Sequence, residues 1–141
     1  MITVADYFMG RRETHGLALS PEIERNAART VEITNKLLAQ AQTYGVVVKA
    51  NPATGSQVSS GWRPPAINAS TKGASPTSHH MTGRAVDLYD PDGELDEWLM
   101  SGIGMAAMEE LGLWLEHPDA TPGWCHLQIV PPGSGRRVFR P

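Results

Sequence analysis

Cysteine is almost absent from this chain. Cys125 is the single cysteine among 141 residues, so no disulfide can form within the chain. No stretch approaches the roughly 20 apolar residues of a transmembrane helix, which argues against membrane insertion. The first residues, MITVADYFMGRRE, lack the basic start and apolar core of a secretory signal. We therefore expect a soluble protein that is made in the cytoplasm.

The sequence also lacks an excess of basic residues, internal repeats and low-complexity tracts. Lysine and arginine number 12 against 15 acidic residues, a net charge of −3 that gives no general attraction to nucleic acid. The short basic cluster at Arg136, Arg137 and Arg140 does not reverse this. Hydrophobic residues make up 40% and charged residues 19%, as in ordinary globular proteins. We expect one domain over residues 1–141, and a monomer.

The strongest helical signal runs from Pro21 to Tyr44. Ser20 is a favoured N-cap residue, proline suits the first helical position, and Gly45 is a natural stop. Apolar or small residues recur every three or four positions and predict one buried stripe: Ile23, Ala27, Val31, Thr34, Leu38 and Ala41.

Short strands and helices should follow this helix without regular alternation. The strands are predicted at Val46–Ala50, Gln57–Trp62, Arg84–Asp90, Leu113–Glu116 and Trp124–Val130. Two short helices are predicted at 91–102 and 103–112, ended by Gly102 and Gly112, and one helical turn at Ala66–Ser70 within a loop over 63–77. The tail from 131 to 141 should be irregular. This order favours an α+β fold with an antiparallel sheet.

Two of the predicted strands each place a possible metal ligand on the face opposite their apolar side chains. Alternation in a strand puts Asp87 with Ala85 and Tyr89, and His126 with Trp124 and Gln128. A histidine pair, 79–80, stands in the turn just before Asp87. Two imidazoles and one carboxylate are a common set for catalytic zinc, with a fourth position left for water. The spacing alone leaves open which of the paired histidines binds, and a polar turn with a half-buried strand histidine explains it equally well.

Three segments resemble the motifs of the zinc D,D-peptidases, peptidase family M15. SHHMTGRAVDL is similar to the signature Ser-x-His-x-x-Gly-x-Ala-x-Asp, with matches at Ser78, His80, Gly83, Ala85 and Asp87. GWCHLQ is similar to the aromatic-x-His motif at Trp124 and His126, and SSGWRPP to a Ser-Gly-aromatic-Arg segment at Ser60, Gly61, Trp62 and Arg63. The motifs follow the family's order, and the chain looks most like the small M15 peptidases encoded by phages and prophages.

The resemblance implies a hedgehog/D,D-peptidase-like fold and a metallopeptidase that cuts peptidoglycan stem peptides. It implies that His80, Asp87 and His126 hold Zn²⁺ and that the neighbouring His79 is not a ligand. Zinc would lower the pKa of a bound water towards ~7 and polarise the scissile carbonyl. Such an enzyme would be made in the host bacterial cytoplasm and act on the cell wall.

The same resemblance gives roles to three further residues. Arg63 would stabilise the developing oxyanion, and Ser78 and Trp124 would contact the substrate. A surface arginine and a turn-forming serine are the plain alternatives for the first two. The scissile bond stays open between L-Ala–D-Glu, D-Ala–D-Ala and a cross-bridge.

The chain departs from the family at the acid/base residue. Many members carry Glu or Asp three positions before the last histidine, where this chain has Gly123. Glu116, at the end of a predicted strand, is our candidate for this role, ahead of Asp119 in the following turn. His117 is either a turn residue or an oxyanion contact. If neither carboxylate acts, the chain is a non-catalytic, zinc-stabilised cell-wall-binding or virion-structural module; a structural domain without metal is the third possibility.

Overall fold

One five-stranded sheet organises the chain, and the computed structural model describes all residues from Met1 to Pro141. The strands are β1 (Val58–Ser60), β2 (Ala85–Tyr89), β3 (Trp114–Glu116), β4 (Trp124–Gln128) and β5 (Val138–Phe139). Their order across the sheet is β1-β2-β4-β3-β5. Neighbours are antiparallel except β3 and β5, which are parallel, so the sheet is mixed and the prediction of a wholly antiparallel sheet was wrong. The single α+β domain is confirmed.

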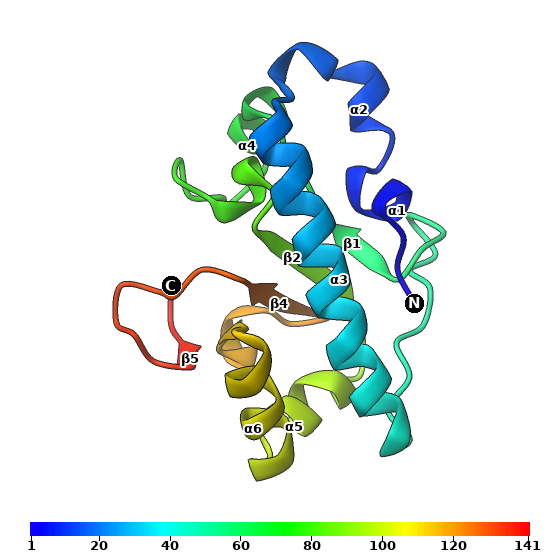
Figure 1. Ribbon diagram of the computed structural model, residues 1–141, viewed down its shortest axis with the longest axis vertical. Coiled ribbons are helices and arrows are strands. Elements are labelled where there is room, and N and C mark those ends of the chain that lie inside the picture. Colours follow the sequence, from blue (N-terminus) through cyan, green and yellow to red (C-terminus); the bar gives the residue numbers. More distant parts are fainter.

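The long helix α3 (Pro21–Thr43) forms where its caps predicted. The Ser20 hydroxyl accepts a hydrogen bond from the backbone N–H of Ile23 at 3.2 Å, and Pro21 occupies the first turn. The helix lies across β2 and β4 (Figure 1). Its buried residues are Ala27, Thr30, Val31, Ile33, Thr34, Leu37, Leu38 and Ala41, which include all of the predicted stripe except Ile23.

Shorter helices surround the sheet and α3. They are α1 (Val4–Phe8), α2 (Arg11–Thr14), α4 (Pro65–Ser70), α5 (Glu94–Met100) and α6 (Gly102–Leu111), with 3₁₀ turns η1 (Gly16–Ala18), η2 (His79–Thr82) and η3 (Pro118–Ala120). The three helices predicted after residue 63 are therefore confirmed. Gly102 starts α6 and does not end α5, because the Ser101 hydroxyl accepts from Gly104 N–H and caps the second helix. None of these helices has both the length and the apolarity to cross a bilayer.

Two strand predictions were wrong. Val46–Ala50 is not a strand, although its valines favour extended backbone. No strand pairs with it, and the Val48 carbonyl accepts a hydrogen bond from the side chain of Gln57 at 2.7 Å. The tail, expected to be irregular, contains β5. Its carbonyls accept backbone hydrogen bonds from β3 and the residue after it, at 2.9 Å between Leu115 N and Arg137 O and 2.7 Å between His117 N and Phe139 O.

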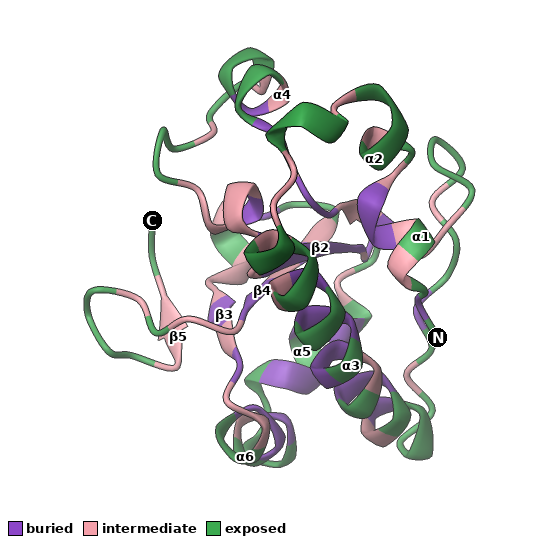
Figure 2. Ribbon diagram, turned by 45° about the horizontal axis from the view of Figure 1, so that its top comes forward, coloured by how far each residue is buried: buried purple, intermediate pink, exposed green.

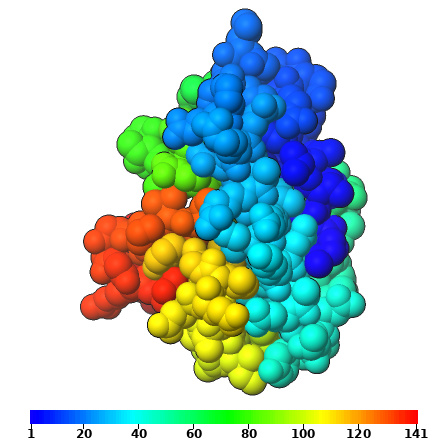
Figure 3. All heavy atoms as spheres, viewed as in Figure 1, coloured from blue at the N-terminus to red at the C-terminus, as the bar shows by residue number.

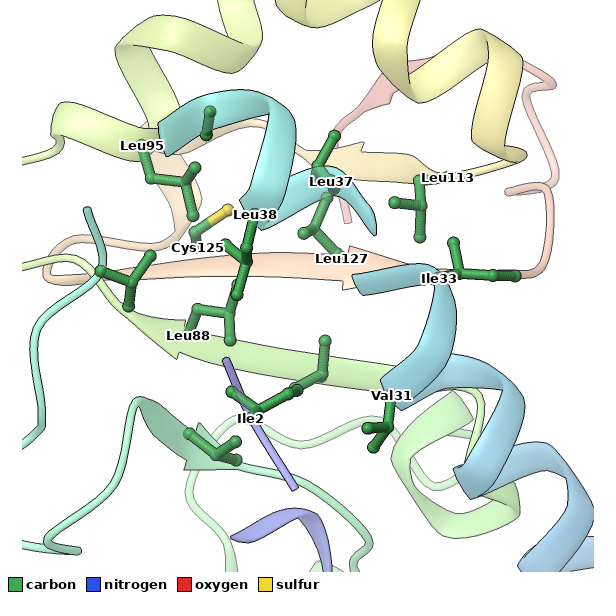
Figure 4. Packing of buried hydrophobic residues seen from close by; sticks show 14 of the residues in the cluster. Ile2, Val31, Ile33, Leu37, Leu38, Leu88, Leu95, Leu113, Cys125 and Leu127 are labelled. Carbon is green, nitrogen blue, oxygen red and sulfur yellow. The ribbon is translucent and has the colours of Figure 1, made fainter. Parts of the chain in front are cut away.

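The hydrophobic core fills the space between α3 and one face of the sheet. Val86 and Leu88 of β2 and Cys125 and Leu127 of β4 point into it, as the alternation predicted. Figure 4 shows Leu88, Cys125 and Leu127 beside side chains of α3, and Figure 2 shows β2 and the inner side of α3 as buried. Burial raises the pKa of the Cys125 thiol well above its ordinary value, so this cysteine is a core residue. The opposite face of these strands is left for polar side chains.

Candidate metal centre

Three of the predicted ligands meet on the sheet face that points away from the core. Asp87 on β2 lies directly opposite His126 on β4 in the strand register. His80, in the turn η2 just before β2, brings a second imidazole to the same point. One ligand atom from each residue lies within 4.8 Å of the other two, and His79 is not part of this group. The structure thus selects His80 from the histidine pair.

The His80 ring is held with one nitrogen free. It is 1% exposed, and its Nδ1 lies 2.8 Å from the carbonyl oxygen of Gly61. Because a carbonyl only accepts, Nδ1 carries the proton and Nε2 carries a lone pair. That Nε2 lies 3.3 Å from the Asp87 carboxylate but has no hydrogen-bond partner. Burial lowers the pKa of His80, although Asp87 opposes the shift, and a neutral imidazole is the form that binds metals.

Two glycines of the motifs allow the backbone to bring His80 into place. A Cβ on Gly61 would lie 1.9 Å from the carbonyl oxygen of Tyr7, so only glycine lets this strand end pass α1. Gly83 follows η2 with φ +77°, and a Cβ there would lie 2.8 Å from the Ile23 carbonyl oxygen of α3. Both positions therefore need glycine for close backbone approach, and Gly83 also for its left-handed conformation.

His126 is held from both of its nitrogens. Its Nδ1 lies 2.8 Å from Asp87 Oδ1, and its Nε2 lies 3.1 Å from Gln128 Oε1. The Gln128 amide nitrogen donates to the Val130 carbonyl at 2.8 Å, which turns the amide oxygen towards the imidazole. Because this oxygen only accepts, Nε2 carries a proton and Nδ1 is the nitrogen that faces the cluster. Sequence alternation placed Gln128 on this face but assigned it no role.

The charges of the trio are coupled. Burial alone would raise the pKa of Asp87, but His80 and His126 outweigh it and hold that pKa below its usual range. Burial alone would lower the pKa of His126, but the hydrogen bond and charge of Asp87 raise it above its ordinary value. A proton on His126 Nδ1 and a metal ion are therefore alternative partners for the same carboxylate. The Nε2 of His80 has no hydrogen-bond partner and could bind a metal ion.

The trio opens into a cleft of about 520 Å³. The four other predicted site residues, Arg63, Ser78, Glu116 and Trp124, all line it. Further walls come from the loop after α4, at residues 72–75, and from the C-terminal segment, at residues 132, 133 and 139–141. Figure 3 shows the green segment around residue 70 on the same side of the molecule as the orange and red C-terminal segment.

Comparison with known proteins identifies no relative. No protein-family model, curated protein or solved structure matches this chain. The hedgehog/D,D-peptidase fold and membership of family M15 thus stay predictions from the motifs.

Arg63 and Ser78 support the ligand turn as well as the cleft. The Arg63 guanidinium donates through Nη2 to the Ser78 hydroxyl at 3.1 Å, and its Nε is buried without a partner. The same hydroxyl accepts from the backbone N–H of His80 at 3.2 Å and so caps η2. Burial lowers the pKa of Arg63, which Asp87 partly offsets. Ser78 therefore joins the arginine to a candidate metal ligand, His80.

The two candidate acid/base carboxylates lie in different surroundings. Glu116 is half-buried in the cleft, and burial raises its pKa although His126 opposes the shift. Asp119 is not among the cleft residues; its side chain is 72% exposed and pairs with Arg140 at 3.4 Å. His117 caps η3 by accepting from Asp119 N–H, so it is a turn residue. Gly123 has φ +91°, a backbone conformation that disfavours glutamate.

Proposed function

We propose that this chain is a zinc metallopeptidase of the M15 type, with the hedgehog/D,D-peptidase fold, that hydrolyses peptide bonds in bacterial peptidoglycan stem peptides. The observation that carries the proposal is the convergence of His80, Asp87 and His126 in an open cleft, with His80 Nε2 at 3.3 Å and His126 Nδ1 at 2.8 Å from Asp87 Oδ1. A buried imidazole nitrogen without a partner fits a metal ligand better than a structural histidine. Two imidazoles and one carboxylate are a donor set that suits zinc and leaves a position for chemistry.

The metal would be held by the trio alone. Zinc at this point supplies a Lewis acid that activates water near neutral pH and polarises the scissile carbonyl. The carbonyl of Gly61 and the amide of Gln128 keep both imidazoles in the tautomer that turns a lone pair towards the ion.

Glu116 is the proposed general acid/base. Its carboxylate oxygen accepts a proton from the attacking water while the water oxygen bonds to the carbonyl carbon. It then returns that proton to the leaving nitrogen as the C–N bond breaks, so no net proton is gained or lost by the enzyme. A carboxyl group whose pKa is raised by burial is suited to both halves of this transfer.

The other cleft residues suit an anionic peptide. Arg63 lines the cleft, and its guanidinium can donate to the carbonyl oxygen as negative charge develops there. Lys72 and Arg140 line the cleft of a protein whose net charge is −3, and Arg140 also pairs with Asp119. Stem peptides carry free carboxylates, and these would be drawn to such a cleft. Trp124 offers a partly exposed apolar surface for the peptide.

The site of action follows from the substrate. The enzyme would be synthesised in the host cytoplasm and would reach the wall in the periplasm or outside, as for phage lytic enzymes. We propose that it acts as a monomer, without nucleic acid and without membrane insertion.

Gly123 favours a second candidate, a zinc-stabilised module that binds the cell wall or the virion without cutting. The position that carries the acid/base in many M15 members has no side chain here, and no hydrogen bond joins Glu116 to the trio. A binding module needs the metal but no acid/base. The two candidates therefore differ in whether the zinc-loaded protein cleaves peptidoglycan.

The deciding experiment incubates purified peptidoglycan with zinc-loaded wild-type, Glu116→Gln and Asp119→Asn proteins. Mass spectrometry identifies released peptides, and zinc content is measured in each sample. We expect cleavage by wild type and Asp119→Asn, and a loss of roughly 10²- to 10⁴-fold in Glu116→Gln with zinc retained. The bond cut is read from the products. A zinc-loaded wild type that binds peptidoglycan but releases nothing supports the binding module.

A further inference from the structure

The last strand places an aromatic ring against a metal ligand. The ring of Phe139 on β5 contacts the His126 imidazole edge-on, with centroids 6.2 Å apart and an interplanar angle of 84°. His80 contacts the same imidazole, with centroids 5.2 Å apart and an angle of 64°. Phe139 is half-buried and lines the metal cleft. Three rings, two of them ligands, thus pack together at the metal centre.

β5 is held in place by contacts that do not involve the Phe139 side chain. The Phe139 carbonyl accepts from His117 N–H at 2.7 Å, and the Arg137 carbonyl accepts from Leu115 N–H at 2.9 Å. The Arg137 guanidinium donates to the Leu113 carbonyl at 2.9 Å and stacks over Trp114 at 4.5 Å. Removing the aromatic ring should therefore leave the strand attached to β3.

Hydrogen bonds reach only the two nitrogens of the His126 ring. Asp87 and Gln128 set the direction of these nitrogens, while the ring carbons are held by the bond to Cβ and by packing. A ring packed edge-on against the imidazole limits small tilts of the ring, and aromatic pairs of this geometry attract beyond simple burial. Metal affinity depends on the rigidity with which ligands are aimed.

We propose that Phe139 is a positioning residue that holds His126 in its metal-binding orientation. The proposal rests on the metal centre of the proposed function. It assigns the C-terminal strand, which lies outside all three sequence motifs, to the active site. In the pairing of β3 with β5, Phe139 lies opposite Glu116. The C-terminal strand is therefore also next to the proposed acid/base residue.

The test measures metal binding directly. Full-length wild-type, Phe139→Ala, Phe139→Tyr and Val138→Ala proteins are stripped of metal, and zinc affinity is measured by competition with a chromogenic chelator at pH 7. The absorption spectrum of each Co²⁺-loaded protein reports ligand geometry. Val138→Ala is the matched control, because Val138 packs against the core on the same strand and is not among the residues that line the cleft.

We expect zinc to bind roughly 10-fold more weakly to Phe139→Ala, with an altered Co²⁺ spectrum, at the lower end of the 10- to 100-fold losses typical of groups that orient ligands. Phe139→Tyr should restore both properties, and Val138→Ala should change neither even if it lowers thermal stability. Equal affinity and spectrum in wild type and Phe139→Ala would overturn the proposal. So would an equal loss in Val138→Ala, since loosening of the strand would then explain the result. If Phe139→Ala does not fold, Phe139→Leu replaces it: retained affinity and spectrum would overturn the proposal, and a loss that tyrosine reverses would support it.

Failure of the proposed function gives a different result. If the wild-type protein binds zinc tightly but does not cut peptidoglycan, the peptidase proposal is wrong, but the role of Phe139 in zinc binding can still be measured. If the wild-type protein does not bind zinc, both the peptidase proposal and the proposed role of Phe139 are wrong.

Discussion

Gln128 offers the sharpest test of how the metal centre is built. Its amide oxygen accepts from His126 Nε2, and its amide nitrogen donates to the Val130 carbonyl. Gln128→Leu keeps the volume of this 4% exposed side chain but removes both hydrogen bonds. The imidazole N–H would then be left without an acceptor, at a cost of about 1–3 kcal/mol. The tautomer with its proton on Nε2, which a metal on Nδ1 requires, would lose the acceptor that favours it.

The expected magnitude follows from the loss of this acceptor. A metal on Nδ1 needs an imidazole whose remaining proton is on Nε2, and without Gln128 that N–H has no acceptor in the metal-bound form. Loss of a group that orients a ligand typically weakens metal affinity by about 10- to 100-fold. That range corresponds to about 1.4–2.8 kcal/mol, which matches the cost of the unpaired N–H.

The assay is zinc competition with a chelator at pH 7, with denaturant unfolding of the apo proteins alongside. Gln128→Glu is the matched control. A carboxylate at this position still accepts from Nε2–H, more strongly than the amide, so zinc should bind at least as tightly as in wild type. A folded Gln128→Leu protein with wild-type affinity would show that the tautomer of His126 is set elsewhere and would refute this account of the site.

Two further substitutions test the scaffold by denaturant unfolding. Gly83→Ala should lower the free energy of unfolding by at least about 2 kcal/mol, because φ is +77° and the added Cβ meets the Ile23 carbonyl at 2.8 Å. Gly133→Ala, which meets nothing within 4 Å, is its control, and equal stability of the two variants would contradict the expectation. Asp96→Asn should stabilise the protein by about 1–2 kcal/mol at pH 8 and by less at pH 5. Burial, with a smaller contribution from nearby Asp90, raises the pKa of Asp96 to about 7, so its charged form destabilises the fold as pH rises from ~4 to ~7. A gain that did not grow between pH 5 and pH 8 would count against this reading.

Local signals in the sequence located the elements that carry the ligands. Caps and periodicity defined α3, and strict alternation put Asp87 and His126 on one face, where the register now pairs them. The turn at His79–Thr82 was visible from its glycine, and the motif resemblance favoured His80 over His79, but the contact that orients His80, with the carbonyl of Gly61, lies 19 residues away. Spacing along the chain carries no information on such a contact.

The features that the sequence did not predict depend on contacts with residues far away in the chain, which a local sequence pattern does not reveal. A two-residue strand such as β5 has no periodicity of its own, and it exists because β3 offers free backbone groups. The valines at 46–48 have high strand propensity but no neighbouring strand, so they do not become part of the sheet. The role of Phe139 was invisible for the same reason, since only the pairing of β5 brings its ring to His126.

The proposed metal centre draws on residues that are far apart in the sequence. Tyr7 packs against the backbone that orients His80, while Phe139 contacts His126 more than 130 residues later. During synthesis from the N-terminus, a nascent chain that has emerged only as far as β2 carries two of the three candidate ligands. Metal capture at the proposed site would therefore begin only after β4 has also emerged from the ribosome. A fragment that ends before β4 should not form this site.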